Sequence, residues 1–219
     1  MTKVKICGIT NAKDALKAAE LGADFLGFIF VPDTPRHILP DVASSIIKRV
    51  REAGYEDIIF TGLFIDAEID KVMDIVNKTG INCLQLHGRE VPGYCDKIKK
   101  RNEKIKIIKT FKVDDKIMDI DGNNTDDYMQ VDFLLFDTYH QVFPGGTGEK
   151  FNLDVVDKNK NNFKKLFFIA GGLTSSNVED AIKQVSPYAV DVSSGVEKEK
   201  GYKDHNLLKE FIQNAKKST

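Results

Sequence analysis

The sequence predicts an α/β fold, a single (β/α)8 TIM barrel of parallel strands and outer helices over residues 1–219. Short apolar runs alternate with amphipathic stretches about eight times, and no long linker separates them. The apolar runs lack polar alternation, which is typical of parallel strands covered by helices on both faces. About eight strand–helix units in 219 residues fit a closed barrel with short loops.

The first two units carry clear signals. Residues 4–7 form a short apolar run, and residues 12–21 follow with apolar side chains at helical spacing behind an N-cap at Asn11. Residues 24–30 are rich in Phe and Ile, which predicts a buried strand. The next helix is expected at residues 40–51, with its apolar residues on one face.

The third and fourth units repeat this pattern. Strands are expected at residues 58–65 and 82–86, where apolar residues predominate. A helix at residues 67–78 carries one apolar face. The helix at residues 91–101 is weaker, because Pro92 is tolerated only in a first turn.

The fifth and sixth units contain the weakest helices. Strands are expected at residues 105–110 and 131–137, the second being strongly apolar. A short helix is expected at residues 112–120, before the polar segment 121–127 (DGNNTDD). Another poor helix is expected at residues 153–159.

The last two units follow a Gly-rich loop at residues 139–150. Strands are expected at residues 166–170 and 189–193, and helices at residues 175–185 and 204–215. An open doubly wound sheet is the competing arrangement. It is disfavoured because the first strand–helix turn, CGIT, lacks the G-x-G-x-x-G pyrophosphate fingerprint.

Composition excludes several classes of protein. The 32 basic residues balance 33 acidic ones, and no basic stripe marks a nucleic-acid interface. No apolar run approaches the ~18 residues of a membrane span, and Lys3 and Lys5 interrupt any signal-peptide core. Three cysteines argue against a disulfide framework and for a reducing compartment. We therefore expect a cytoplasmic protein that binds neither nucleic acid nor membrane.

Two adjacent glycine loops point to a phosphate-bearing substrate. Strand ends and the loops after them form the catalytic face of a barrel, and phosphate commonly binds after strands seven and eight. Gly171 and Gly172 follow the seventh strand, and Ser194 and Gly195 follow the eighth. Glycines that open a helix present backbone N–H groups to an anion. A tight turn without a ligand is the alternative interpretation.

Cys7 and Asp137 form a candidate base and acid at the ends of the first and sixth strands, roughly opposite each other. A helix N-terminus after Ile9 is expected to enlarge the thiolate fraction of Cys7. The apolar strand before Asp137 favours its protonated form. One base and one acid across a pocket suffice for a proton-transfer isomerisation. The alternatives are a buried core thiol at Cys7 and an ion pair or N-cap at Asp137.

Arg36 lies in a proline-containing loop, where its guanidinium could clamp a carboxylate or merely sit at the surface. Gln85 ends the fourth strand, and His87 after it is interpreted as structural. Cys83 and Cys95 have no partner at metal-ligand spacing, so both are interpreted as structural thiols and no metal is predicted.

Nine motifs in register resemble the phosphoribosylanthranilate isomerase family of tryptophan biosynthesis, and they run nearly end to end. The motifs are KICGIT (5–10), GFIF (27–30), TPRHI (34–38), GLFID (62–66), LQLHG (84–88), LLFDT (134–138), GGTGEKFN (145–152), IAGGL (169–173) and VDVSSGVE (190–197). Each motif alone is weak, but their order along the chain is specific.

The resemblance implies an Amadori rearrangement of N-(5-phosphoribosyl)anthranilate to 1-(2-carboxyphenylamino)-1-deoxyribulose 5-phosphate. Cys7 would be the general base at ribose C2′, and Asp137 would be the general acid at the ring oxygen. Arg36 would bind the anthranilate carboxylate. No cofactor is implied, because the substrate's anilino nitrogen forms the Schiff base. The predicted substrate-binding residues are Arg36, Gln85, Gly171, Gly172, Asp191, Ser193, Ser194 and Gly195.

Two other functions remain open at this stage. A non-catalytic sugar-phosphate-binding barrel would be expected to lose Cys7 or Asp137, and both are present. A histidine-pathway isomerase performs the same rearrangement, but that family usually has Asp where this chain has Cys7. The predicted partner is the small-molecule substrate, in a monomer or a homodimer.

Overall fold

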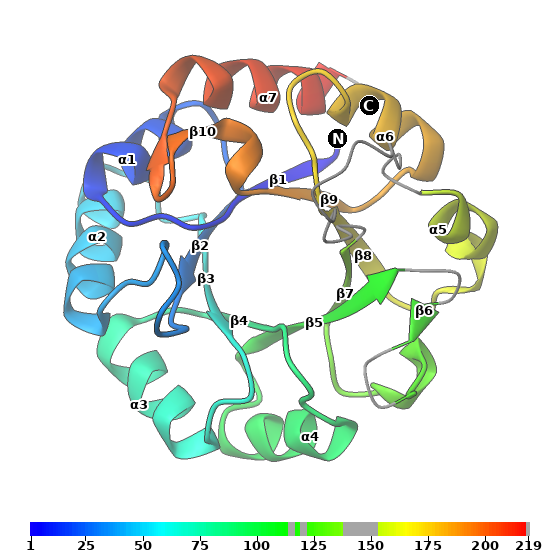
Figure 1. The fold of residues 1–219 in the computed structure, drawn as a ribbon. Helices are drawn as coiled ribbons and strands as arrows, with labels where there is room; N and C mark the ends of the chain where they lie inside the picture. Colours follow the sequence, from blue (N-terminus) through cyan, green and yellow to red (C-terminus); the bar gives the residue numbers. More distant parts are fainter. Residues whose placement is uncertain (114–116, 119–121, 138–152, 218–219) are drawn as a thin grey trace.

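Within the residues that the computed structural model describes, 1–113, 117–118, 122–137 and 153–217, eight parallel strands close into a barrel (Figure 1). Each strand pairs with its neighbours around the ring, and the pairing of β1 with β9 completes it. The predicted fold class is confirmed. The ring consists of β1 (Lys3–Ile6), β2 (Phe25–Ile29), β3 (Ile59–Phe64), β4 (Cys83–Leu86), β5 (Lys106–Val113), β7 (Phe133–Asp137), β8 (Leu166–Ala170) and β9 (Ala189–Val192).

Helices surround the strands and bury one apolar face each, as their sequence periodicity predicts (Figure 1). In α3, for example, Val72, Ile75 and Val76 face the strands. No described helix is both long enough and apolar enough to cross a bilayer. The helices are α1 (Ala12–Glu20), α2 (Pro40–Glu52), α3 (Ile69–Thr79), α4 (Pro92–Arg101), α5 (Asp154–Asn159), α6 (Val178–Val185) and α7 (His205–Lys217).

The barrel interior changes from apolar to polar toward the carboxyl ends of the strands. Apart from the apolar core between the helices and the strands, a separate apolar cluster fills the interior of the barrel. It includes Phe25, Ile108 and Phe168. On β4 and β9, the buried Cys83 and Ala189 are each followed two residues later by a polar side chain, Gln85 and Asp191. Because side chains alternate across a strand, residues two apart share a face. The polar side chains therefore gather at the carboxyl end of the barrel.

The predicted helix at residues 112–120 is wrong. β5 continues to Val113 and pairs antiparallel with β6 (Ile117–Met118). Phe111 and Val113 are buried while Lys112 between them is exposed, which is the two-residue period of a strand. The Gly-rich loop predicted at residues 139–150 lies outside the described residues.

A hairpin after β9 was not predicted. β10 (Glu197–Glu199) pairs antiparallel with β11 (Tyr202–Lys203), and Gly201 in its turn has a φ of +85°. The hairpin attaches to α1, because the backbone N–H of Lys203 donates to Asp14 Oδ2 at 2.9 Å. The prediction of a single domain over residues 1–219 stays a prediction.

Candidate active site

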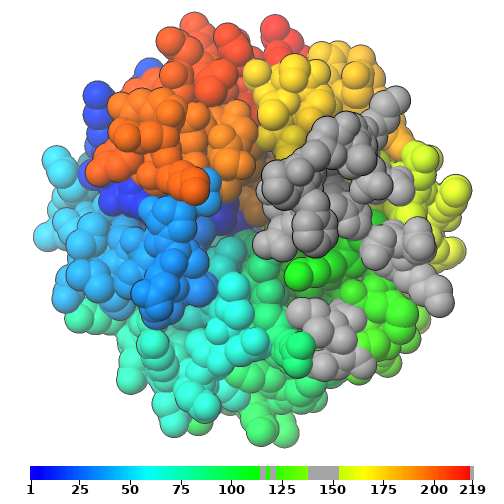
Figure 2. All heavy atoms as spheres, viewed as in Figure 1, coloured from blue at the N-terminus to red at the C-terminus, as the bar shows by residue number. Residues whose placement is uncertain are grey.

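One cavity of about 530 Å³ opens at the carboxyl end of the barrel, where Figure 2 shows the surface hollowed near its centre. The ten residues predicted for the site all line it, although their roles stay predictions. β1 and β7 are separated by β9 and β8, so they approach the cavity from different sides. The ten are Cys7, Arg36, Gln85, Asp137, Gly171, Gly172, Asp191, Ser193, Ser194 and Gly195.

Cys7 follows β1 and is 4% exposed in this cavity. Its backbone N–H donates to Val192 O at 2.8 Å, and a Cβ at Gly27 would come within 2.9 Å of its Sγ. Gly27 therefore makes room for the thiol. Burial raises the pKa of Cys7, while the nearby Lys5 lowers it. Burial outweighs the favourable charges, so the pKa of Cys7 lies above its ordinary value in the free protein. The expected contribution of a helix N-terminus to the thiolate stays a prediction.

A buried lysine that was not predicted for the site lies beside the thiol. Lys5 is fully buried; its Nζ donates to Gln85 Oε1 at 2.7 Å and to Asp191 Oδ2 at 2.9 Å. The other Asp191 oxygen, Oδ1, is buried without a hydrogen-bond partner among the described residues. A lysine two positions before Cys7 in an apolar strand was the available signal.

Asp137 has a histidine neighbour. His87 Nε2 lies 3.5 Å from Asp137 Oδ2, and its Nδ1 lies 3.2 Å from Gln85 Nε2. Burial lowers the pKa of His87, and the Asp137 charge offsets part of that effect. His87 is thus neutral at neutral pH and lines the cavity, so its interpretation as merely structural missed its position beside the candidate acid.

Arg36 is not a free surface residue. Its Nε and Nη2 donate to the two carboxylate oxygens of Glu197 at 2.7 and 2.6 Å. Glu197 also accepts from the fully buried Lys203 at 3.0 Å, and Lys203 Nζ donates to Ser193 O at the same distance. The unpredicted β10–β11 hairpin therefore orients the guanidinium at the cavity wall.

The two glycine loops lie side by side, because β8 pairs with β9. Gly171 and Gly172 have φ values of +91° and +67°, which glycine adopts at little cost. A Cβ at Gly195 would lie 1.9 Å from Leu173 O, so the loops pack too closely for any side chain there. The Gly171–Gly172 pair does not open a helix as expected, since α6 begins at Val178.

Polar groups in these loops face the cavity. Ser193 Oγ is buried and has no hydrogen-bond partner among the described residues. Such a group acquires a partner when a polar ligand binds. In the described ranges, no three His, Cys, Asp or Glu side chains are placed to hold a metal ion.

Several known proteins that resemble this chain over nearly its whole length belong to one family. The family described as N-(5'phosphoribosyl)anthranilate (PRA) isomerase matches residues 4–214. The N-(5'-phosphoribosyl)anthranilate isomerase of Trichlorobacter lovleyi is 42% identical, with 100% of both chains covered. The isomerase of Thermotoga neapolitana is 40% identical, with 99% of both chains covered.

Solved structures give the same result. A phosphoribosyl anthranilate isomerase from Thermotoga maritima superposes with a TM-score of 0.83 at 37% identity, over 99% of this chain and 100% of that one. An isomerase in complex with reduced 1-(o-carboxyphenylamino)-1-deoxyribulose 5-phosphate superposes with a TM-score of 0.80 at 35% identity, over 99% and 100%. The chain thus belongs to the N-(5'-phosphoribosyl)anthranilate isomerase family of tryptophan biosynthesis, as its motifs indicated.

Proposed function

We propose that this chain converts N-(5-phosphoribosyl)anthranilate into 1-(2-carboxyphenylamino)-1-deoxyribulose 5-phosphate, with Cys7 as general base and Asp137 as general acid. The observation that carries the proposal is the shared cavity: both residues line it from different strands, beside two glycine loops and a cation. A relative of the same fold is solved with the reduced form of that product, which supports the substrate class.

The substrate carries two anionic ends, and the cavity offers a place for each. Backbone N–H groups of the loops at Gly172, Ser194 and Gly195 suit the phosphate, because glycine leaves the amides accessible. Arg36 suits the anthranilate carboxylate through its remaining N–H groups, because Glu197 already accepts from Nε and Nη2. The ribose would then lie between Cys7 and Asp137.

The chemistry requires one proton donor and one proton acceptor. Asp137 would give its proton to the furanose ring oxygen; the C1′–O bond breaks and the anilino nitrogen forms a Schiff base. The Cys7 thiolate would then remove the C2′ proton, which the Schiff base has acidified, and the electrons move toward nitrogen to give the enamine. The enol then tautomerises to the ketone. The substrate's own nitrogen acts as the electron sink, so we propose no cofactor.

The neighbours of Asp137 and Asp191 fit supporting roles. His87, neutral beside Asp137, would orient the carboxyl group toward the ring oxygen. Asp191 Oδ1 would accept a ribose hydroxyl, because its other oxygen is already bonded to Lys5. Gln85 links the group around Cys7 to the group around Asp137, because it contacts both Lys5 and His87.

The test is turnover of the purified chain with two substrates. We expect loss of anthranilate fluorescence with N-(5-phosphoribosyl)anthranilate and no reaction with the imidazole-carboxamide substrate of the histidine pathway. A tryptophan auxotroph lacking this step should grow when it expresses the chain but not the Cys7→Ala variant. Turnover of the histidine-pathway substrate alone would overturn the proposed specificity. The cytoplasmic location and the oligomeric state stay predictions.

A further inference from the structure

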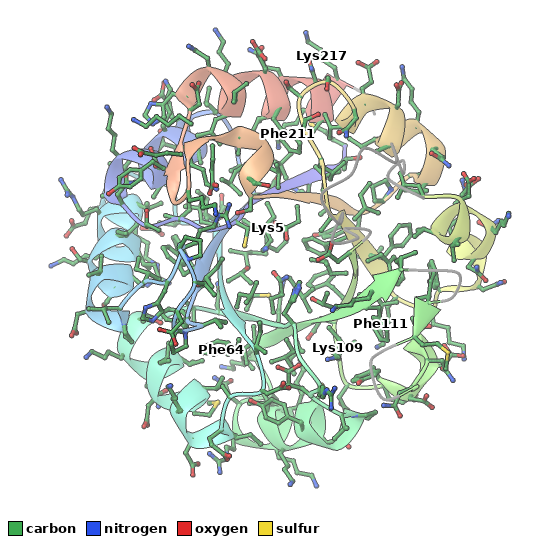
Figure 3. All side chains as sticks on the ribbon, in the orientation of Figure 1. Lys5, Phe64, Lys109, Phe111, Phe211 and Lys217 are labelled. Atoms are coloured by element: carbon green, nitrogen blue, oxygen red, sulfur yellow. The ribbon has the colours of Figure 1, made fainter. Side chains whose placement is uncertain are left out.

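Lys5 lies on β1 beneath the cavity, two residues before Cys7, which follows the strand. Residues two apart on a strand share a face, so the Lys5 side chain points into the barrel, as Figure 3 shows. It is fully buried and does not line the cavity. Its ammonium is bonded to Asp191 and Gln85. Burial raises the pKa of the Cys7 thiol, and the Lys5 charge opposes this effect.

Five charged residues surround Cys7, in two groups. Lys5 on β1 and Asp191 on β9 form one ion pair. Arg36 after β2, Glu197 on β10 and Lys203 on β11 form the second group. Within these two groups, three cations against two carboxylates leave one positive charge in excess. Lys200 and Asp137, one residue of each sign, and His87 line the same cavity. Ionisation of the Cys7 thiol would neutralise this set, which makes a buried thiolate less costly.

We propose that Lys5 is a positioning residue that stabilises the Cys7 thiolate and restrains the Asp191 carboxylate from opposing it. The inference rests on the proposed role of Cys7 as the general base. Without Lys5, the Asp191 charge would act on the thiolate uncompensated, and like charges within a buried site disfavour ionisation. Lys5 would then contribute to catalysis although no atom of it touches the substrate.

Lys5 is not itself the base. Burial opposes its charge, but the pairing with Asp191 prevails, and the pKa of Lys5 lies above its ordinary value. It therefore stays an ammonium with no lone pair to accept the C2′ proton. Its contribution is a fixed positive charge beneath the reacting sulfur, which is electrostatic preorganisation.

The test measures the ionisation of Cys7 apart from turnover. The rate of Cys7 alkylation by iodoacetamide is followed against pH by mass spectrometry, which reports the thiolate fraction. The other two thiols serve as internal references, because burial raises the pKa of Cys83 and of Cys95 to about 12. In Lys5→Met we expect the Cys7 profile to move up by at least ~1 pH unit, with alkylation at pH 8 at least ~10-fold slower.

Turnover should follow the thiolate. In Lys5→Met we expect kcat/KM at neutral pH to fall by a similar factor, through kcat, with KM changed less than about threefold. The matched control is Lys109→Met. Lys109 is equally buried and paired with Glu90 at 3.0 Å, but lies outside the cavity lining. It should lose stability while the Cys7 profile stays in place.

A second variant keeps the test decisive if Lys5→Met folds poorly. Lys5→Met/Asp191→Asn removes the carboxylate together with its cation, so no unpaired charge stays buried. Its Cys7 profile should lie below that of Lys5→Met. An unchanged profile in both variants would overturn the role of Lys5. A shifted profile with unchanged kcat would instead keep the electrostatic effect and reject Cys7 as the base.

Discussion

Cys7 combines deep burial with a raised pKa, which is an unusual setting for a base. The proposed mechanism needs a thiolate and a protonated carboxyl at the same pH. These two requirements conflict, because a carboxyl ordinarily loses its proton at a lower pH than a thiol. In the proposed mechanism, the form with a thiolate and a protonated acid is then a minor species. A nearby positive charge that favours the thiolate increases the population of this form. Lys5 and Lys203 both act in this direction on Cys7.

The role of Cys7 is tested by Cys7→Ala. We expect kcat to fall by about 10²–10⁴-fold, the range for a lost general base, with KM little changed. Cys83→Ala is the control, because Cys83 is a buried thiol outside the cavity lining and should affect stability only. Retention of more than about half the activity in Cys7→Ala would show that this thiol only packs.

The role of Asp137 is tested by the pH profile. When base and acid ionise in this reversed order, kcat/KM is a plateau bounded by two limbs. The ascending limb bends at the pKa of the acid, because above it the gain in thiolate is offset by the loss of protonated acid. The descending limb begins at the pKa of the thiol, because above it the thiolate fraction no longer rises while the protonated acid still declines. Since burial raises the pKa of Cys7, the descending limb should begin at a higher pH than the ionisation of an exposed thiol.

Asp137→Asn should remove most of the activity and abolish the lower bend, so that the residual kcat/KM rises with pH up to the thiol ionisation and does not fall above it, while substrate affinity stays near that of the parent. His87→Gln is the matched change, since it keeps a hydrogen-bonding group beside Asp137 and should lower kcat less. A near-normal kcat for Asp137→Asn would assign ring opening to another group.

At the scale of elements, the β10–β11 hairpin fixes the orientation of the Arg36 guanidinium. Its Glu197 holds the guanidinium through two hydrogen bonds and is buried itself. A helical or strand period was not recognisable in so short a segment, and the sequence analysis missed the hairpin. The helix predicted at residues 112–120 was wrong for a related reason. The segment is short, and its residues 112–113 and 117–118 pair as strands β5 and β6.

The hairpin's contribution is tested through product affinity. Arg36→Ala should weaken product binding by about 10–100-fold, and Arg36→Lys should restore only part, because the fork geometry is lost. Glu197→Gln should also weaken binding, although we expect no contact between Glu197 and the ligand. Glu199→Gln, exposed on the same hairpin, should have no effect. Unchanged affinity in both Arg36 variants would mean that another residue binds the carboxylate.

At the scale of the whole molecule, ligand binding and stability are linked. Inorganic phosphate should bind the two glycine loops, inhibit competitively, and raise Tm by about 3–6 °C at ten times its Kd. Gly172→Asp should abolish this rise, since it places a negative charge in the site. Gly54→Asp is the control: Gly54 also has a positive φ, +90°, but lies in open space outside the cavity lining. Noncompetitive inhibition would place the anion elsewhere.

The sequence by itself determined the barrel and the residues at its catalytic end. Apolar runs that lack alternation can be buried only in a covered parallel sheet, and strand ends in a barrel converge on one face. Cys7, Asp137 and the glycine loops were therefore predictable without coordinates. Only the tertiary structure decided the electrostatics around them. Lys5 meets Gln85 and Asp191, which lie 80 and 186 positions away along the chain. Such contacts depend on how the ring closes and on which side chains fill its interior, and no local pattern encodes them.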